Sequence, residues 1–266
     1  MKIFDWLLKR KNKKKIKLGL ALGSGGAKGF AELGALKAFE ENGIEFDIVA
    51  GTSIGSIIGA FYANGYSSTD IFEMLKSVYF GEIKNLFMIK MDTSGLKSVI
   101  DKAIGQIAIE ELKKPFMAVA TELDTGNEKD FDKGSVADAL CASSSMPPFF
   151  KPVIIDGVRY IDGAFTNSVP ADLVRRMGAD YVVGIDLSVR DAKPGMLSKI
   201  FPTYKSNVKE PWKKGYDNSD VMLHPDLKGF ESYEFWNGLK IYDIGYQEAI
   251  KYIPTIKEGI EKAKKR

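Results

Sequence analysis

The chain has 266 residues, of which 45% are hydrophobic, and this is enough to bury the core of one large globular domain. A single cysteine, Cys141, excludes a framework of intramolecular disulfides and is typical of a reducing compartment. One histidine, His224, and one cysteine leave no ligand set for zinc or an iron–sulfur cluster. The sequence also lacks a run of about 18 apolar residues, which excludes a membrane-spanning helix.

Residues 1–15 are predicted to form a basic amphipathic extension. Residues 1–17 hold eight lysines and arginines against one acidic residue, so the rest of the chain is mildly acidic. The apolar residues of the extension share one helical face beside the basic run, which is typical of a segment that lies on an anionic bilayer. A disordered, solvated extension is the alternative. Because no recognition motif accompanies the lysines, nucleic acid is not an expected partner. We expect a cytoplasmic protein that can also sit peripherally at the inner membrane surface.

The first predicted element is a strand over residues 16–22, apolar enough to be buried on both faces of a parallel sheet. It runs into the glycine-rich loop Gly23-Ser-Gly-Gly-Ala-Lys-Gly29. A helix with an apolar stripe follows and ends at Asn42-Gly43. Free backbone N–H groups converge where such a loop meets a helix, so the loop is predicted to bind an anion or a partial negative charge.

Three functions compete for this loop. A nucleotide P-loop requires Ser or Thr after the lysine, but Gly29 follows Lys28. The glycine spacing of a dinucleotide-binding loop is not matched either. The third function is an oxyanion hole, in which Gly25 and Gly26 offer backbone N–H groups to a carbonyl oxygen. Lys28 is then either a surface lysine or a residue that attracts an anionic head group.

The next motif lies between a short buried strand that ends at Ala50 and a helix over residues 54–64. Gly51-Thr-Ser-Ile-Gly55 fits the G-x-S-x-G pattern of a nucleophile elbow. The tight turn strains the serine backbone and leaves no room for a Cβ on its neighbours, which explains the glycines. Ser53 would then project at the positive end of the following helix. A glycine-rich turn that only packs a helix on a strand is the alternative.

The middle of the chain alternates between short strands and helices. A helical stretch is predicted over residues 67–112, followed by a hairpin of strands at 115–121 and 128–131 and a helix at 136–144. A second hairpin at 153–161, a helix that ends at 177 and a buried strand at 181–187 come next. Asn167 and Pro170 lead into that helix. Asp156-Gly157 is the expected turn of the second hairpin. Asp162-Gly163 repeats the pair with no returning strand after it, so hairpin chemistry does not explain it. Asp162 is therefore a candidate functional residue.

An activated serine needs a base to accept its proton. Asp162 is the carboxylate with a motif around it, and it could take the proton of Ser53 directly. The sole histidine, His224, lies in an aromatic-rich stretch, residues 201–242, that is predicted to form a loop-rich cap. His224 with Asp226 could instead complete a triad, and this alternative stays open.

Three ordered motifs resemble the patatin-like phospholipase family: Gly23–Gly29, Gly51–Gly55 and Asp162-Gly-Ala164. Residues 142–147 and 167–170 are similar to the family as well, and the resemblance extends over about residues 16–190. It implies an α/β protein with a three-layer α/β/α fold and a mostly parallel central sheet. Residues 16–190 would form the catalytic core, and residues 191–266 an aromatic-rich cap and C-terminal helix of the same domain. Ser24 departs from the glycine that the family often has there, which puts the loop shape in doubt.

The resemblance implies hydrolysis of carboxylic esters of phospholipids or related lipids, without a metal or cofactor. It implies a Ser53–Asp162 dyad, with Gly25 and Gly26 as the oxyanion hole. The remaining motif glycines are Gly23, Gly29, Gly51, Gly55 and Gly163. Two other functions are carried as alternatives: a catalytically idle scaffold on a membrane surface and a nucleotide-binding α/β module. The expected partners are therefore a lipid or acyl-ester substrate and, through residues 1–17, an anionic membrane surface.

Overall fold

A computed structural model describes residues 16–81, 92–189 and 204–265 of the chain. The predicted basic extension, residues 1–15, lies outside the described residues, as does the start of the predicted cap. Within the described ranges, none of the helices combines the length and the apolarity that crossing a bilayer requires.

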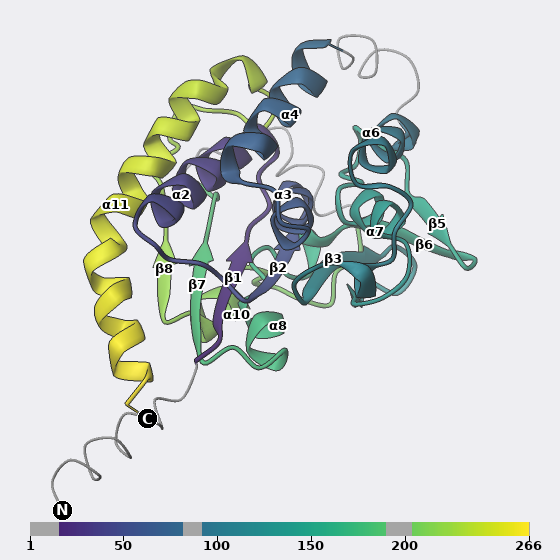
Figure 1. Cartoon of the computed structure of the whole chain (residues 1–266). Coiled ribbons are helices and arrows are strands. Elements are labelled where there is room, and N and C mark those ends of the chain that lie inside the picture. The colour runs from purple at the N-terminus through teal and green to yellow at the C-terminus, as the bar shows by residue number, and fades with distance from the viewer. Residues whose placement is uncertain (1–15, 82–91, 190–203, 266) are drawn as a thin grey trace, which may run out of the picture.

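The described strands form one mixed sheet at the centre of the molecule (Figure 1). Its order is β5-β6-β3-β2-β1-β7-β8, and β4 also pairs with β3. The parallel strands are β1 (Leu18–Leu22), β2 (Ile48–Thr52), β3 (Phe116–Glu122), β7 (Tyr181–Ile185) and β8 (Val221–Leu223). The antiparallel strands are β4 (Glu128–Phe131), β5 (Val153–Ile155) and β6 (Val158–Asp162). The prediction of a mostly parallel sheet is thus confirmed.

Helices cover both faces of this sheet, because alternate residues of each buried strand point to opposite sides. Leu20 and Leu22 of β1 join the larger core, whereas Ala21 joins a smaller one on the other face. The larger core includes residues of α2 (Phe30–Glu41), α3 (Ile54–Ala63), α4 (Ser68–Gly81), α6 (Ser94–Ile104), α7 (Val136–Ser143) and α11 (Gly238–Ala263). The smaller core includes α8 (Ala171–Arg176), against which α10 (Lys213–Asn218) packs. This arrangement confirms the three-layer α/β/α fold.

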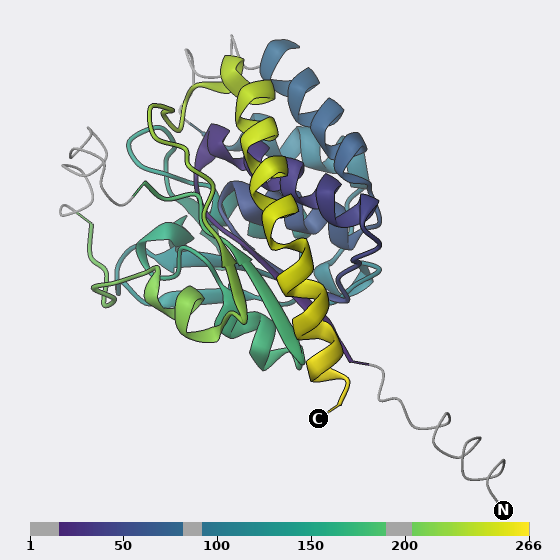
Figure 2. The same cartoon turned by 90° about the vertical axis from the view of Figure 1, so that its left-hand side faces the viewer.

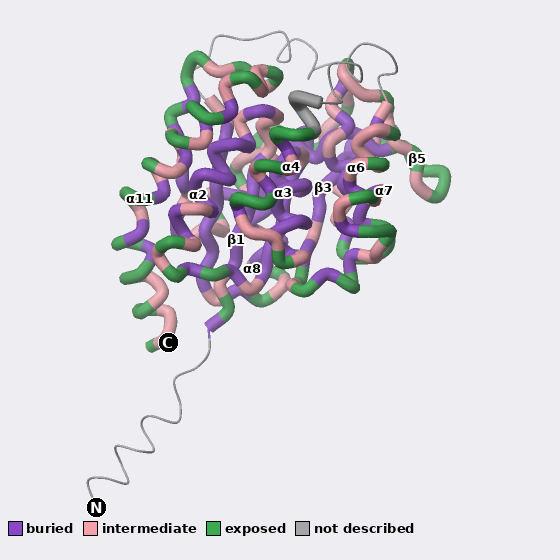
Figure 3. Tube along the Cα trace, turned by 45° about the horizontal axis from the view of Figure 1, so that its top comes forward, coloured by how far each residue is buried: buried purple, intermediate pink, exposed green. Residues whose placement is uncertain are grey.

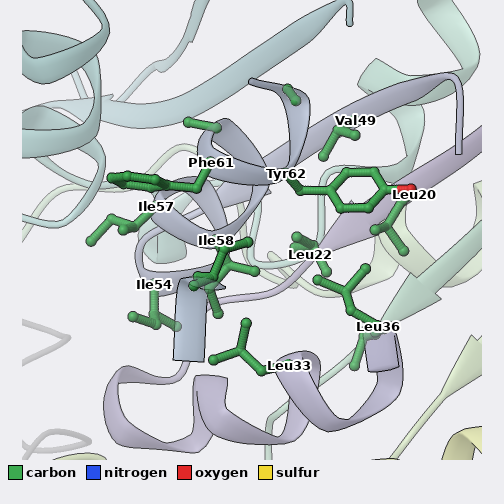
Figure 4. Packing of buried hydrophobic residues seen from close by; sticks show 14 of the residues in the cluster. Leu20, Leu22, Leu33, Leu36, Val49, Ile54, Ile57, Ile58, Phe61 and Tyr62 are labelled. Atoms are coloured by element: carbon green, nitrogen blue, oxygen red, sulfur yellow. The ribbon is translucent and has the colours of Figure 1, made fainter. Parts of the chain in front are cut away.

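Helix α3 lies inside the larger core, and every one of its residues is buried. Figure 4 shows Ile58 of α3 in one cluster with Leu33 of α2 and Leu22 of β1, and each of these three side chains is almost or completely buried. The helix therefore has almost no freedom to shift against the sheet. A residue at its first turn, such as Ser53, is held by the core of the protein.

Helix α11 lies along α2, as the views of Figures 1 and 2 agree. The two helices approach closely at glycines, since a Cβ on Gly245 would lie 1.9 Å from the carbonyl oxygen of Ala31. In Figure 3, the trace of α11 alternates between buried and exposed residues, as expected for an outer helix that packs on one side.

The segment that sequence analysis assigned to a cap also contributes to the sheet. Val221–Leu223 forms β8 beside β7, in a parallel pair. The sequence did not predict this strand, because it has only three residues and is flanked by polar and turn-forming positions. The predicted C-terminal helix is present as α11.

Candidate active site

Ser53 occupies the turn between β2 and α3, as the G-x-S-x-G pattern predicts. Its φ of 56° and ψ of −125° place a non-glycine residue in strained backbone geometry. The flanking glycines allow the turn, since a Cβ on Gly51 would lie 2.2 Å from the carbonyl oxygen of Gly55. A Cβ on Gly55 would lie 2.5 Å from the carbonyl oxygen of Leu22. Neither position accepts a side chain without moving backbone.

Hydrogen bonds from two other serines hold this strained residue. The backbone N–H of Ser53 donates to Ser143 Oγ at 2.9 Å, and Ser143 is fully buried at the end of α7. The hydroxyl of Ser56 donates to the carbonyl oxygen of Ser53 at 2.6 Å. Thr52, the last residue of β2, donates its hydroxyl to the carbonyl oxygen of Asn167 at 2.7 Å. The turn is therefore tied to α3, α7 and the segment after β6.

Asp162 lies beside Ser53, so the structure brings the two predicted residues together. Ser53 Oγ donates to Asp162 Oδ2 at 2.6 Å, and the N–H of Ala164 donates to Asp162 Oδ1 at 2.8 Å. Asp162 ends β6 and caps the short 3-10 helix η3 (Gly163–Phe165). Gly163 lets the chain after Asp162 pass close to β3, because a Cβ there would lie 2.3 Å from the carbonyl oxygen of Val119.

Burial changes the acidity of Asp162. The carboxyl group is fully buried, and this desolvation raises its pKa to about 7, while the hydrogen bonds from Ser53 and Ala164 lower it. A carboxyl group with a pKa near neutrality can both accept and return a proton at physiological pH. The pair therefore has the geometry and the acidity of a nucleophile with its base.

The glycine-rich loop lies next to the same turn and is held by its neighbours. The N–H of Gly23 donates to Glu32 Oε1 at 2.6 Å, and the N–H of Ala27 donates to the carbonyl oxygen of Ser232 at 2.7 Å. By contrast, the N–H groups of Gly25 and Gly26 donate to no other residue in the described part of the chain. They are the donors predicted for an oxyanion hole, and they remain available for a ligand.

An apolar cavity of about 490 Å³ opens above the pair. Ser53, Asp162, Gly25 and Gly26 all line it. Apolar side chains of α3, α4, α6 and the segment after α7 form much of the remaining wall, among them Ile57, Phe61, Leu75, Ile100, Met146 and Phe149. Such a volume and lining are typical of a site for an apolar small molecule.

Lys28, within the glycine-rich loop, lines the cavity. Burial lowers the pKa of its ammonium group, while Glu231 and Glu234 act in the opposite direction. Among the described residues that line the mainly apolar cavity, Lys28 is the one with a basic side chain.

The structure does not bring His224 to the pair. His224 Nδ1 lies 3.1 Å from the hydroxyl of Tyr216 and 3.5 Å from Asp186 Oδ2, and the residue does not line the cavity. Ser53 is instead bonded to Asp162. The described contacts of His224 therefore do not support a triad through this residue. Cys141 is buried in α7, and burial raises the pKa of its thiol to about 12, which fits helix packing.

Two residues that hold the site were not predicted from the sequence. Ser143 lies in the segment 142–147 that resembles the family, but it bonds to Ser53 across 90 positions of the chain, and no local pattern reveals such a partner. Glu32 is the second, and it did leave a signal. It interrupts the apolar stripe of α2, where a fully buried carboxylate needs a specific partner.

The sequence model of the patatin-like phospholipases matches residues 20–175. Patatin-like phospholipase domain-containing protein 7 of Mus musculus is 33% identical over an alignment of 189 positions, which covers 65% of this chain and 14% of the mouse protein. Lysophospholipase nte1 of Aspergillus fumigatus is 26% identical over an alignment of 279 positions, which covers 90% of this chain and 18% of the fungal protein. The chain thus spans a fifth or less of the length of these relatives.

Among solved structures, VipD from Legionella pneumophila has a similar fold. It superposes with a TM-score of 0.55 at 14% identity, over 91% of this chain and 67% of VipD. This likeness concerns the fold, whereas the sequence match concerns the part of the chain that carries the elbow, the glycine loop and Asp162. Since the family match covers more than half of the 266 residues, the chain belongs to the patatin-like phospholipase family.

Proposed function

We propose that the protein is a serine acyl hydrolase that cleaves carboxylic esters of lipids. The observation that carries this proposal is the 2.6 Å hydrogen bond from Ser53 Oγ to Asp162 Oδ2 at the wall of an apolar cavity. A nucleophile, a base of suitable acidity and a site for an acyl chain meet at one place. Family membership supports the same class of reaction.

In the first step, Ser53 Oγ attacks the carbonyl carbon of the ester, and its proton passes to Asp162 Oδ2 along the existing hydrogen bond. The carbonyl oxygen gains negative charge as the new bond forms. The N–H groups of Gly25 and Gly26 stabilise this charge, together with the N–H of Ile54 at the start of α3. Collapse of the intermediate breaks the ester bond, and the leaving alkoxide takes the proton from Asp162.

In the second step, water hydrolyses the acyl-enzyme. Asp162, again ionised, removes a proton from the water, whose oxygen bonds to the acyl carbon. The same backbone N–H groups stabilise the second intermediate. Ser53 Oγ then leaves and recovers its proton from Asp162, so the carboxylic acid is released and the dyad is restored.

The substrate proposal follows from the cavity and the relatives. The apolar wall suits an acyl chain, and Lys28 of the glycine-rich loop suits an anionic head group. The fungal relative is named a lysophospholipase and the mouse relative a patatin-like phospholipase domain protein. We therefore propose phospholipids or lysophospholipids as the substrate class.

The test is hydrolysis of p-nitrophenyl esters of increasing chain length by the wild type, Ser53→Ala and Asp162→Asn. We expect both substitutions to abolish turnover while the proteins stay folded, as measured by circular dichroism. His224→Ala is the matched control and should retain activity, because its ring is bonded to Tyr216 and not to the dyad. A fluorophosphonate probe should label the wild type at Ser53 and leave Ser53→Ala unlabelled.

The same assays separate the two alternatives. A catalytically idle scaffold would bind lipid vesicles but hydrolyse no ester and react with no fluorophosphonate. A nucleotide-binding module would bind ATP or NAD at the glycine loop, and substitutions at Ser53 would leave that binding intact. Activity that survives in Ser53→Ala would refute the proposed nucleophile.

A further inference from the structure

Three large apolar side chains are exposed together just before and at the start of α11. Tyr233 is 51% exposed, Trp236 64% and Leu239 66%. The rings of Tyr233 and Trp236 lie 6.3 Å apart between centroids. We call these three residues the Trp236 surface. Single apolar residues are ordinary on protein surfaces, whereas large apolar side chains that are exposed next to one another indicate a binding surface.

The Trp236 surface is continuous with the cavity. Tyr233 both belongs to this surface and lines the cavity, and Phe235, next to Trp236, lines it as well. The short 3-10 helix η5 (Phe235–Asn237) thus presents one aromatic residue to the cavity and the next to solvent. Whatever binds the exposed residues lies at the mouth of the proposed acyl site.

The segment is fixed in place, so its exposure is built into the fold. The carbonyl oxygen of Ser232 accepts the N–H of Ala27 from the glycine loop at 2.7 Å. Gly238 packs on Phe30, where a Cβ would lie 2.9 Å from the ring. These contacts tie both ends of the Trp236 surface to η1 (Gly26–Gly29) and α2, beside Ser53.

We propose that the Trp236 surface inserts into the surface of a lipid bilayer or micelle and holds the mouth of the cavity against it. Tryptophan and tyrosine favour the boundary between head groups and acyl chains, where an apolar ring and a polar edge are both satisfied. An acyl chain could then pass from the lipid into the cavity with little exposure to water. This delivery role rests on the proposed function, whereas the insertion itself does not.

The charge around the Trp236 surface indicates which lipid it fits. Residues 228–240 contain two lysines and two glutamates, so electrostatic attraction to an anionic membrane is not expected there. Binding should depend on apolar insertion, occur on zwitterionic phosphatidylcholine and change little with salt. The basic extension of residues 1–17 is predicted to behave in the opposite way, with salt-sensitive binding to anionic lipid.

The Trp236 surface lies at the opposite end of the parallel strands from Ile16, the first described residue. Ile16 precedes the amino end of β1, whereas Ser53 follows the carboxyl end of the parallel strand β2. Figure 1 shows the amino end of β1 and the amino end of α11 at opposite ends of the molecule. Salt concentration and lipid charge separate binding through the Trp236 surface from the binding expected of residues 1–17.

The experiment is flotation of the full chain with phosphatidylcholine vesicles in about 0.5 M salt, where charge effects are screened. Ser53→Ala is used as the background, so that no turnover occurs during binding. We expect Trp236→Ala to weaken binding about tenfold, the loss that corresponds to one large apolar side chain, and Leu239→Ala to weaken it less. Ile154→Ala is the matched control, because Ile154 is 67% exposed on β5, at the other edge of the sheet.

Three results would overturn the proposal. The first is equal binding by Trp236→Ala and the control, or no binding of the parent to phosphatidylcholine. The second is binding that requires anionic lipid and disappears on deletion of residues 1–15. The third is a dimer of the parent in analytical ultracentrifugation that Trp236→Ala converts to a monomer, which would assign the surface to a second copy. Because binding is measured without turnover, failure of the proposed hydrolase activity would leave this test intact.

Discussion

Asp162 should make activity and stability respond to pH in opposite directions. The carboxyl group is fully buried, and burial raises its pKa in the folded protein to about 7. In the unfolded chain its pKa is about 3.9. Below that value both states are protonated and Asp162 has no effect on stability. Between about 4 and 7 only the unfolded chain loses the proton, so the free energy of unfolding falls as pH rises, and above about 7 the loss is complete.

The size of this loss follows from the difference between the two pKa values. A difference of about 3 pKa units corresponds to about 4 kcal/mol at 25 °C, which is a large part of the stability of an ordinary domain. Activity changes with the opposite sign, because only the ionised carboxylate can accept the proton of Ser53 Oγ. The kcat/KM for a soluble ester should therefore rise with pH and level off above about 7.

Urea unfolding of the wild type and of Asp162→Asn between pH 4 and 8 measures the first effect. Asparagine cannot ionise, so we expect the variant to gain stability relative to the wild type as pH rises. Glu32 is also buried with a raised pKa, but it is present in both proteins and cancels in the difference. The reasoning is refuted if the difference in unfolding free energy is flat with pH, or if the wild type hydrolyses a soluble ester equally well at pH 5 and pH 8.

Substitutions at three further positions test contacts of the site and of the packing between α11 and α2. Ser143→Ala removes the acceptor of the Ser53 N–H and should cost about 1–3 kcal/mol in urea unfolding and lower kcat, whereas Ser77→Ala, at an exposed hydroxyl of α4, should change neither. Glu32→Gln keeps an oxygen acceptor for the Gly23 N–H and should retain most of the activity, whereas Glu32→Leu removes the acceptor and should lower kcat about tenfold or more. Equal kcat values for the two variants would contradict a role for this hydrogen bond. Gly245→Ala forces α11 away from α2 and should lower the unfolding free energy by about 1–3 kcal/mol. An unchanged thermal midpoint would show that the helices can separate freely, and Gln247→Ala, at an exposed position of α11, is the control.

The residues that could be predicted are those whose signal is local in the sequence. Gly51 and Gly55 surround Ser53 within one turn, and their purpose can be deduced from backbone sterics alone. The Asp156-Gly157 turn is likewise local, and both of its residues adopt positive φ, as the hairpin requires. The repeated Asp-Gly pair at Asp162 stood out because the same local rule failed to explain it. Its position next to Ser53 in space rested on the resemblance to a family, not on the pattern.

The contacts that hold the site could not be predicted, because they join distant parts of the chain. Ser143 and Ser53 are bonded although α4, α6, β3 and β4 lie between their elements in the sequence, and a serine near the end of a small-residue helix has many ordinary explanations. The strand β8 is a similar case. Three residues carry too little periodicity to indicate a strand, and Val221–Leu223 is extended because β7 offers it a partner.

The strain at Ser53 connects these two observations. A φ of 56° at a serine costs on the order of 1–3 kcal/mol, and a turn of this kind persists only where surrounding contacts fix it. The local sequence shows that the strain exists, since only glycines can flank it. The long-range bonds from Ser143 and Thr52, together with the buried packing of α3, supply the compensation. A chain with the same pentapeptide but without these partners would relax the turn and move Ser53 Oγ away from Asp162. The pentapeptide therefore acts as a nucleophile elbow only within this fold, which is why the order of the three motifs was more informative than any one of them.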